Sequence, residues 1–176
     1  MNLNNSTTKE DEKDLAQTPV WFVKAVENYL RIKFTLDVCC IKETAKCKKY
    51  YSLKEKRDGL SLPWSKYNWC NPPYSDITPW VIKASNEALK GKTSCLLIPD
   101  KPEVGYVREC KKLSDTIIHM PFRLNFLKPD GTEFLDKEGK KQGPKFPVLV
   151  ALFTPFGIDM PTRDIYYDFR LLKEDY

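Results

Sequence analysis

Several features that mark common protein classes are scarce or missing in this sequence. His119 is its single histidine, and none of the six cysteines stands in a CxxC pair, so the ligand spacing of a zinc site is missing. No apolar run approaches the roughly 18 residues that a membrane-spanning helix needs. Residues 1–17 also lack the apolar segment of a signal peptide. We therefore expect reduced thiols, no metal, no membrane contact and a location in the cytoplasm.

The composition that remains suits one folded domain with a mildly basic surface. The chain has 176 residues, of which 41% are hydrophobic and 12% aromatic. A chain of this length buries about 70% of the surface that its unfolded form exposes. Its 29 Lys and Arg residues exceed its 24 Asp and Glu residues, which gives a net charge of +5. Such an excess is compatible with a polyanionic partner, but many proteins with this charge bind none.

The order of apolar and polar segments predicts an α/β protein. A polar arm is expected at 1–16, a domain at 17–156 and, at 157–176, a tail that packs on the domain or extends from it. Helices are predicted from Thr18-Pro19 to about residue 30, from Thr78 to Gly91 and over 102–113, with Thr18 and Thr78 as N-caps. Strands are predicted over 34–40, 67–70, 93–98, 115–119 and 148–153. A loop or loose hairpin is predicted over 128–146. This alternation indicates a mostly parallel sheet with helices on both faces, whose ligands bind beyond the carboxyl ends of the strands.

The most informative stretch is Asn71-Pro72-Pro73-Tyr74, which follows an apolar strand and precedes a well-marked helix. An amine on a planar aromatic ring is a poor nucleophile, because its lone pair is delocalised. The side-chain oxygen of Asn71 and the backbone carbonyl of Pro72 can each accept a hydrogen bond from such an amine, and the two prolines stiffen the loop. Tyr74 offers a flat face for stacking. The tetrapeptide is suited to positioning a planar amine for attack, although Asn-Pro also opens ordinary turns.

From Thr18 to about Phe156 the chain resembles the phage-type DNA N-6-adenine methyltransferases, in which Asn-Pro-Pro-Tyr is the catalytic signature. The resemblance rests on matches in the same order along the chain: Thr18-Pro19, Phe34-Thr35-Leu36-Asp37-Val38, Ala45-Lys46-Cys47, Tyr50-Tyr51, Asp58-Gly59-Leu60, Trp64, Trp69-Cys70 with the tetrapeptide and Ser75, Trp80-Val81, Lys83-Ala84, Leu97-Ile98-Pro99, Phe122-Arg123-Leu124 and Phe126.

The resemblance implies a compact, truncated Rossmann-like methyltransferase fold. It implies S-adenosyl-L-methionine as the methyl donor, lying across the strand ends with its sulfonium toward Asn71. The target adenine is then extruded from the DNA duplex, and the methyl group passes directly to its N-6 amine without a covalent enzyme intermediate or a metal. The resemblance further suggests a phage-encoded enzyme that works in the host cytoplasm and masks phage DNA from restriction.

Residue by residue, the resemblance assigns Asn71, Pro72, Pro73 and Tyr74 to the target base. For the donor it assigns Thr18 and Pro19 to the methionine moiety, Asp37 to the ammonium group and Asp58 to the adenine or ribose; Cys39 stands where many adenine methyltransferases have a glycine-rich turn. From the residues alone, Thr18-Pro19 also fits a simple helix start, Asp37 a helix cap or an ion pair with lysine, and Asp58 an Asp-Gly turn.

Basic residues concentrate in the two long polar segments, 41–63 and 128–146. We expect Lys48 and Lys49 in the first, and Lys140 and Lys141 in the second, to contact DNA phosphates if both segments border the face that bears Asn-Pro-Pro-Tyr. Arg123 is a further candidate, for DNA or for a core acid. A solvated charged surface explains the same residues equally well.

Other activities remain open at this stage. The planar amine can instead be a protein glutamine, N-4 of cytosine or a guanine in RNA, because Asn-Pro-Pro-Tyr occurs in those classes as well. A relative that binds nucleic acid without catalysis is a further alternative. A monomer or a small homo-oligomer fits the length of the chain.

Overall fold

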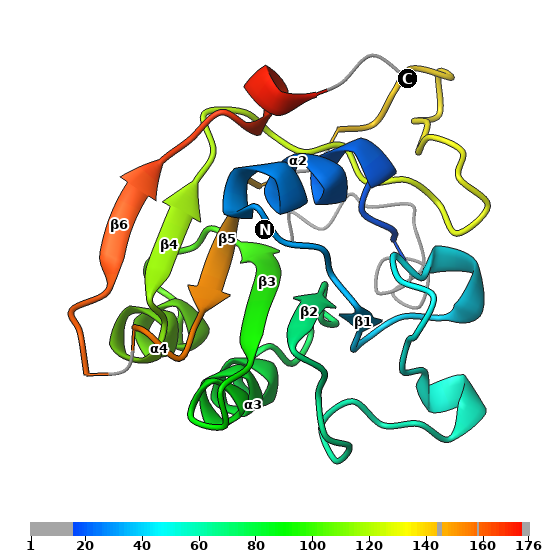
Figure 1. The fold of residues 1–176 in the computed structure, drawn as a ribbon. Helices are drawn as coiled ribbons and strands as arrows, with labels where there is room; N and C mark the ends of the chain where they lie inside the picture. The colour runs from blue at the N-terminus through cyan, green and yellow to red at the C-terminus, as the bar shows by residue number, and fades with distance from the viewer. Residues whose placement is uncertain (1–15, 144–145, 158, 174–176) are drawn as a thin grey trace.

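The computed structural model describes residues 16–143, 146–157 and 159–173. The expected polar arm lies outside these residues apart from Ala16, and so do the last residues of the expected tail. Within the described part, helices and strands alternate along most of the chain (Figure 1), which confirms the α/β class.

A six-stranded sheet forms the centre of the described residues, in the order β1-β2-β3-β5-β4-β6. The strands span Leu36–Asp37 (β1), Tyr67–Cys70 (β2), Thr93–Pro99 (β3), Thr116–His119 (β4), Val148–Phe153 (β5) and Arg163–Tyr166 (β6). Neighbouring strands pair in parallel except at β5, which runs antiparallel to both β3 and β4. Hence β3 and β4 point the same way, and β5 alone runs against the rest. The sheet is mostly parallel, as predicted, with one antiparallel strand near its middle.

Helices cover both faces of the sheet. Helix α3 (Thr78–Ala88) and helix α4 (Gly105–Leu113) lie side by side on one face, and helix α2 (Val20–Leu30) covers the other (Figure 1). Successive residues of β3 serve the two faces in turn: Leu96 packs with the α3–α4 cluster, whereas Leu97 packs with the α2 cluster. Burial on both faces explains why the central strands are mainly apolar.

The starts of two helices differ from the prediction. Pro19, not Thr18, is the N-cap of α2, and Ile77, not Thr78, is the N-cap of α3; neither helix has a side-chain cap hydrogen bond. The hydroxyl of Thr18 is therefore not used by the helix. At the other end of α3, Gly91 adopts φ of +80°, a conformation that favours glycine, and this fits its predicted role as the stop signal.

Three further elements depart from the sequence pattern. The strand expected over 34–40 pairs only at Leu36 and Asp37, because the chain then turns away toward the cavity described below. The helix expected from residue 102 begins at Gly105. The region of the expected tail, for which no helix or strand was predicted, contains β6 and a short 3-10 helix at Phe169–Leu172. Backbone pairing with β4 holds β6 in the sheet.

His119 ends β4 and has a structural role in the sheet. Its Nδ1 lies 2.6 Å from a carboxylate oxygen of Asp100, which follows β3, and its Nε2 lies 3.0 Å from a carboxylate oxygen of Asp164 in β6. The ring also stacks on Tyr166 at 5.0 Å between centroids. These contacts join three strands at the carboxyl edge of the sheet.

Candidate active site

A cavity opens at the carboxyl ends of β1 and β2, where the fold class predicts a ligand site. Its walls come from the segment before α2, the end of β1 with the residues after it, the loop over 51–59 and the start of the Asn-Pro-Pro-Tyr loop. Five of the predicted site residues line it: Thr18, Asp37, Cys39, Asn71 and Pro73. Pro19, Asp58, Pro72 and Tyr74 lie outside its lining.

Asn71 follows the last residue of β2 and is held by a backbone contact from a distant segment. Its Nδ2 donates a hydrogen bond to the backbone carbonyl of Ala16 at 3.3 Å. Its Oδ1 is buried and has no hydrogen-bond partner among the described residues. The amide is thereby oriented with its acceptor unused.

Tyr74 closes the same loop and packs against two other aromatic rings. Its ring centroid lies 6.1 Å from that of Phe126, at nearly a right angle, and 6.0 Å from that of Phe146. Burial raises the pKa of Tyr74 well above its ordinary value, so the phenol stays neutral and can donate a hydrogen bond. Its hydroxyl is buried without a partner in the described part of the chain.

The buried side-chain polar atoms that lack a partner among the described residues are three: Thr18 Oγ1, Asn71 Oδ1 and Tyr74 OH. A buried donor or acceptor without a hydrogen bond costs about 1–3 kcal/mol, so each such atom in a folded protein calls for an explanation. All three belong to the predicted donor and target-base residues. Thr18 and Asn71 line the cavity, whereas Tyr74 does not, so the two cavity residues hold hydrogen-bonding capacity that the described residues leave unused.

Asp37 places a buried carboxylate in the cavity wall at the end of β1. Its Oδ1 accepts a hydrogen bond from the backbone N–H of Cys39 at 3.3 Å, and its Oδ2 accepts one from the backbone N–H of Lys46 at 3.0 Å. Burial raises the pKa of Asp37 to about 6, although these two hydrogen bonds oppose the rise. The ammonium of Lys46 donates instead to Gln17 at 2.6 Å. A carboxylate in such surroundings favours a cationic ligand.

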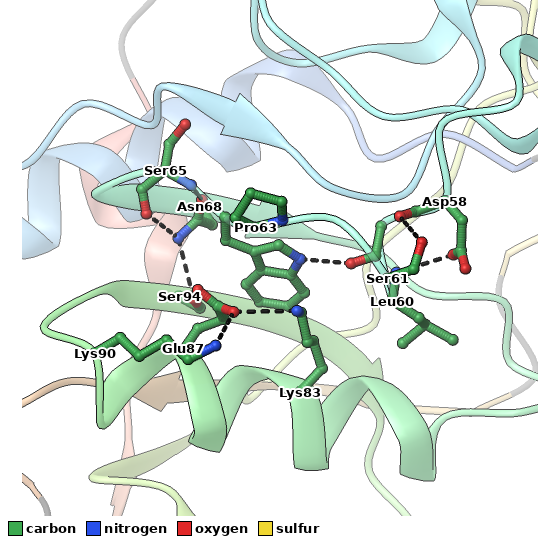
Figure 2. A network of polar contacts seen from close by, with 12 residues as sticks. Asp58, Leu60, Ser61, Pro63, Ser65, Asn68, Lys83, Glu87, Lys90 and Ser94 are labelled. Carbon is green, nitrogen blue, oxygen red and sulfur yellow. Dashed lines mark hydrogen bonds and ion pairs between the residues drawn. The ribbon is translucent and has the colours of Figure 1, made fainter.

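Asp58 acts within its own turn. Its Oδ1 accepts a hydrogen bond from the backbone N–H of Leu60 at 2.9 Å, and Figure 2 shows the carboxylate turned to this loop. The flanking residues Arg57 and Gly59 line the cavity, whereas Asp58 does not. The contacts match the Asp-Gly turn that the sequence left open, and the donor role stays a prediction.

Gly59 has a steric role that the sequence did not reveal. A Cβ atom at this position would lie 2.0 Å from the carbonyl oxygen of Val38 and 3.0 Å from the ring of Trp80. The carbonyl of Gly59 accepts a hydrogen bond from the indole of Trp64 at 2.7 Å. The glycine therefore lets the loop close against the end of β1 and complete the cavity wall.

A polar network connects α3 and the start of β2 with their surroundings (Figure 2). Glu87 is only 1% exposed and accepts hydrogen bonds from Lys83 at 3.1 Å and from Lys90 at 3.0 Å. Buried Asn68 in β2 donates to the carbonyls of Ser65 and Thr93. These contacts fix α3 and the start of β2, which present the Asn-Pro-Pro-Tyr loop between them.

The predicted DNA contacts are all exposed: Lys48, Lys49, Arg123, Lys140 and Lys141. Lys140 and Lys141 lie on a hairpin over 127–142, where they form exposed ion pairs with Glu138 and Glu133. Exposed pairs of this kind are weak, so the two ammonium groups can exchange these partners for phosphates.

Neither a metal centre nor a membrane span is found in the part of the chain that the structure describes. Across the described ranges, no group of three or more His, Cys, Asp and Glu side chains is arranged to hold a metal ion. No helix in these ranges is long and apolar enough to cross a bilayer.

Several residues of the site were not found from the sequence. Gln17, Cys40, Lys46 and Trp69 line the cavity, as does Gly59. Lys46, Gly59 and Trp69 stand in segments that carry the family resemblance, but no site role was predicted for them. Gln17 lies outside those segments.

Comparison with known proteins agrees with this geometry. The model of the family described as DNA N-6-adenine-methyltransferase (Dam) matches residues 5–161. The DNA N-6-adenine-methyltransferase of Haemophilus phage HP1 (strain HP1c1) is 29% identical over 175 residues, which cover 98% of this chain and 96% of that protein. Because the family match spans most of the chain, including every predicted site residue, the chain belongs to the DNA N-6-adenine-methyltransferase (Dam) family, adenine-specific DNA methyltransferases.

Proposed function

We propose that this protein transfers a methyl group from S-adenosyl-L-methionine to N-6 of an adenine that is extruded from DNA and held by Asn71-Pro72-Pro73-Tyr74. The observation that carries the proposal is the set of three buried, unpartnered polar atoms on Thr18, Asn71 and Tyr74, at the carboxyl edge of the sheet. Family membership supplies the substrate class, and these atoms supply the hydrogen-bonding capacity that a donor and a base would satisfy.

The cavity residues fit a donor that carries both an ammonium group and polar groups. Asp37 offers a desolvated carboxylate to the ammonium, and the Thr18 hydroxyl offers an unused donor and acceptor beside it in the wall. Cys39, half-buried at the turn after β1, presents a small side chain to the cavity. When bound, the donor supplies an electrophilic methyl group on a sulfonium.

The tetrapeptide residues divide the work of holding the adenine. Asn71 Oδ1 and the Pro72 carbonyl each accept a hydrogen bond from one N–H group of the exocyclic amine. This favours a geometry in which the nitrogen lone pair is directed away from the ring plane. Tyr74 provides an aromatic surface, kept in place by Phe126 and Phe146. The Asn71 amide is oriented in advance by Ala16, so little reorganisation is needed when the base arrives.

The basic residues then contact the DNA backbone. Lys48, Lys49, Arg123, Lys140 and Lys141 are exposed, and we expect them to neutralise phosphates in a manner independent of sequence. We expect binding to weaken steeply with salt for this reason.

The decisive experiment follows radiolabelled methyl groups from S-adenosyl-L-methionine into DNA, RNA and protein offered in parallel. We expect label in DNA alone, recovered as N-6-methyladenine after digestion. Label in protein or RNA alone would overturn the proposal. Calorimetry with S-adenosylhomocysteine completes the test, since a chain that binds no donor is a non-catalytic relative.

A further inference from the structure

Gln17 joins three parts of the molecule immediately before the cavity residue Thr18. Its backbone pairs with Leu127 in both directions, at 2.8 and 3.0 Å. Its side-chain Nε2 donates to the carbonyls of Lys128 at 2.8 Å and of Pro129 at 3.1 Å. Its Oε1 accepts from the ammonium of Lys46 at 2.6 Å. One half-buried amide thus uses its two N–H groups and its oxygen at once.

The contact with Lys46 leads directly to the donor side of the cavity. The backbone N–H of Lys46 is bound to the carboxylate of Asp37, and both residues line the cavity together with Gln17. A movement of Gln17 would therefore displace Lys46, whose backbone N–H holds the Asp37 carboxylate.

The contacts with residues 127–129 lead to the basic hairpin. Residues 127–142 are held internally by backbone hydrogen bonds, such as Lys128 to Thr132 and Gln142 to Phe134. The hairpin bears Lys140 and Lys141, and most of its side chains are exposed, so few packing contacts fix it to the body of the protein. Gln17 is hydrogen-bonded to the base of this hairpin. The base follows directly after Phe126, which packs on Tyr74.

We infer that Gln17 is a positioning residue whose side-chain amide fixes the base of the 127–142 hairpin relative to the donor cavity, so that DNA held by the hairpin meets the cavity in register. The DNA part of this inference rests on the proposed function; the fixing of the hairpin does not. An amide is required, because a carboxylate in its place can still accept from Lys46 but cannot donate to the two carbonyls.

The test uses the full chain with Gln17→Glu, which keeps the contact to Lys46 and removes the two to the hairpin. We expect faster hydrogen exchange at the hairpin amides of Lys128, Asp136 and Gln142, with exchange in β3 and β5 unchanged. We expect a KM for DNA raised by roughly tenfold or more, with kcat at saturating S-adenosyl-L-methionine changed much less than KM.

Gln142→Glu is the matched control, because it places the same charge on the hairpin itself without touching Gln17. It measures the electrostatic cost of the charge, which the effect of Gln17→Glu must exceed. If Gln17→Glu does not fold, Gln17→Asn, which keeps the amide but shortens its reach, must show the same faster exchange.

Unchanged exchange in the hairpin, or a fall in kcat as large as the rise in KM, would overturn the inference. A wild-type chain that methylates no DNA would remove the proposed function instead, and the exchange measurement would still decide whether Gln17 fixes the hairpin.

Discussion

The Asn71 side chain donates to the backbone carbonyl of Ala16 at 3.3 Å, across 55 positions of the sequence. This hydrogen bond uses the amide nitrogen within the protein. The amide oxygen is buried and has no partner among the described residues, so it can accept a hydrogen bond from a ligand. A side-chain amide held at one end is a fixed acceptor, and fixed dipoles stabilise a developing charge without reorganising.

Replacement of Asn71 by alanine is expected to abolish methyl transfer while donor binding persists. Loss of one fixed polar group of this kind lowers kcat by about 10²–10³, whereas the affinity for S-adenosylhomocysteine, measured by calorimetry, should stay near that of wild type. Asn71→Asp keeps an acceptor oxygen but not the contact to Ala16, so its loss should be smaller. Full activity of Asn71→Ala would remove this residue from the proposed role.

Donor binding should depend on pH through Asp37. Burial raises the pKa of Asp37 to about 6. Between about pH 4 and pH 6, the folded protein without donor therefore keeps this carboxyl protonated, whereas the unfolded chain does not. This group's contribution to the free energy of unfolding therefore falls as pH rises from about 4 to 6. The ammonium of the donor needs the carboxylate, so donor affinity must rise over the same interval.

Calorimetric titration with S-adenosylhomocysteine between pH 5 and pH 7.5 measures this dependence. We expect affinity to increase with pH up to about 6.5 and proton release on binding near pH 6. Asp37→Asn should bind weakly and without this pH dependence. An identical pH profile in wild type and variant would show that Asp37 does not face the donor's charge.

Gly59→Ala should damage both stability and donor binding. The added methyl group would lie 2.0 Å from the carbonyl oxygen of Val38, and neither backbone segment can yield cheaply. We expect the free energy of unfolding in urea to fall by about 1–3 kcal/mol, with weaker binding of S-adenosylhomocysteine. Gly105→Ala is the control: its nearest neighbour would be the flexible Arg108 side chain at 3.9 Å, so it should change stability by less than about 1 kcal/mol.

Buried Glu87 should contribute more to the stability of the fold than its exposed partner Lys90 does. Burial alone would raise the pKa of Glu87, but hydrogen bonds from Lys90 and Lys83 outweigh it, and the pKa lies below its ordinary value. Stabilisation by this carboxylate is therefore present above the unfolded pKa and lost as pH falls toward the folded one.

We expect Glu87→Ala to lower the free energy of unfolding by about 1–3 kcal/mol, because Lys83 is left partly buried without its carboxylate. Lys90→Ala should cost less than about 1 kcal/mol, since that side chain is 61% exposed. Urea titrations at pH 7 and pH 4 check both values. Equal costs for the two variants would contradict this account.

The core strands could be predicted from sequence because each is a short, mainly apolar run. Tyr67–Cys70 and Val148–Phe153 were predicted with their observed bounds. Strand β6 could not be predicted in this way, because Arg163–Tyr166 is largely exposed and is held by main-chain hydrogen bonds to β4 rather than by apolar burial. The capping errors have a different cause: Thr18 was expected to cap a helix, but Pro19 is the N-cap and Thr18 lies in the cavity lining.

The site was predictable only where a motif or a family match named its residues. The Asn-Pro-Pro-Tyr loop and Asp37 carried such signals, and the structure brings Asn71 and Asp37 to one cavity. Gln17 carried none, and Lys46 matched the family without a predicted role. Their roles depend on a hydrogen bond between segments 29 residues apart and on carbonyls more than a hundred residues further along. Contacts of this kind arise from the tertiary fold and leave no local pattern.

The placement of β5 between β3 and β4 has a consequence for how the chain is made. Translation releases β3 and β4 before β5, so a nascent chain that has not reached Val148 cannot join them. Until then two apolar strands present unsatisfied edges, which invite pairing with other chains. Ribosome-bound chains that stop short of this point should be the species most dependent on chaperones.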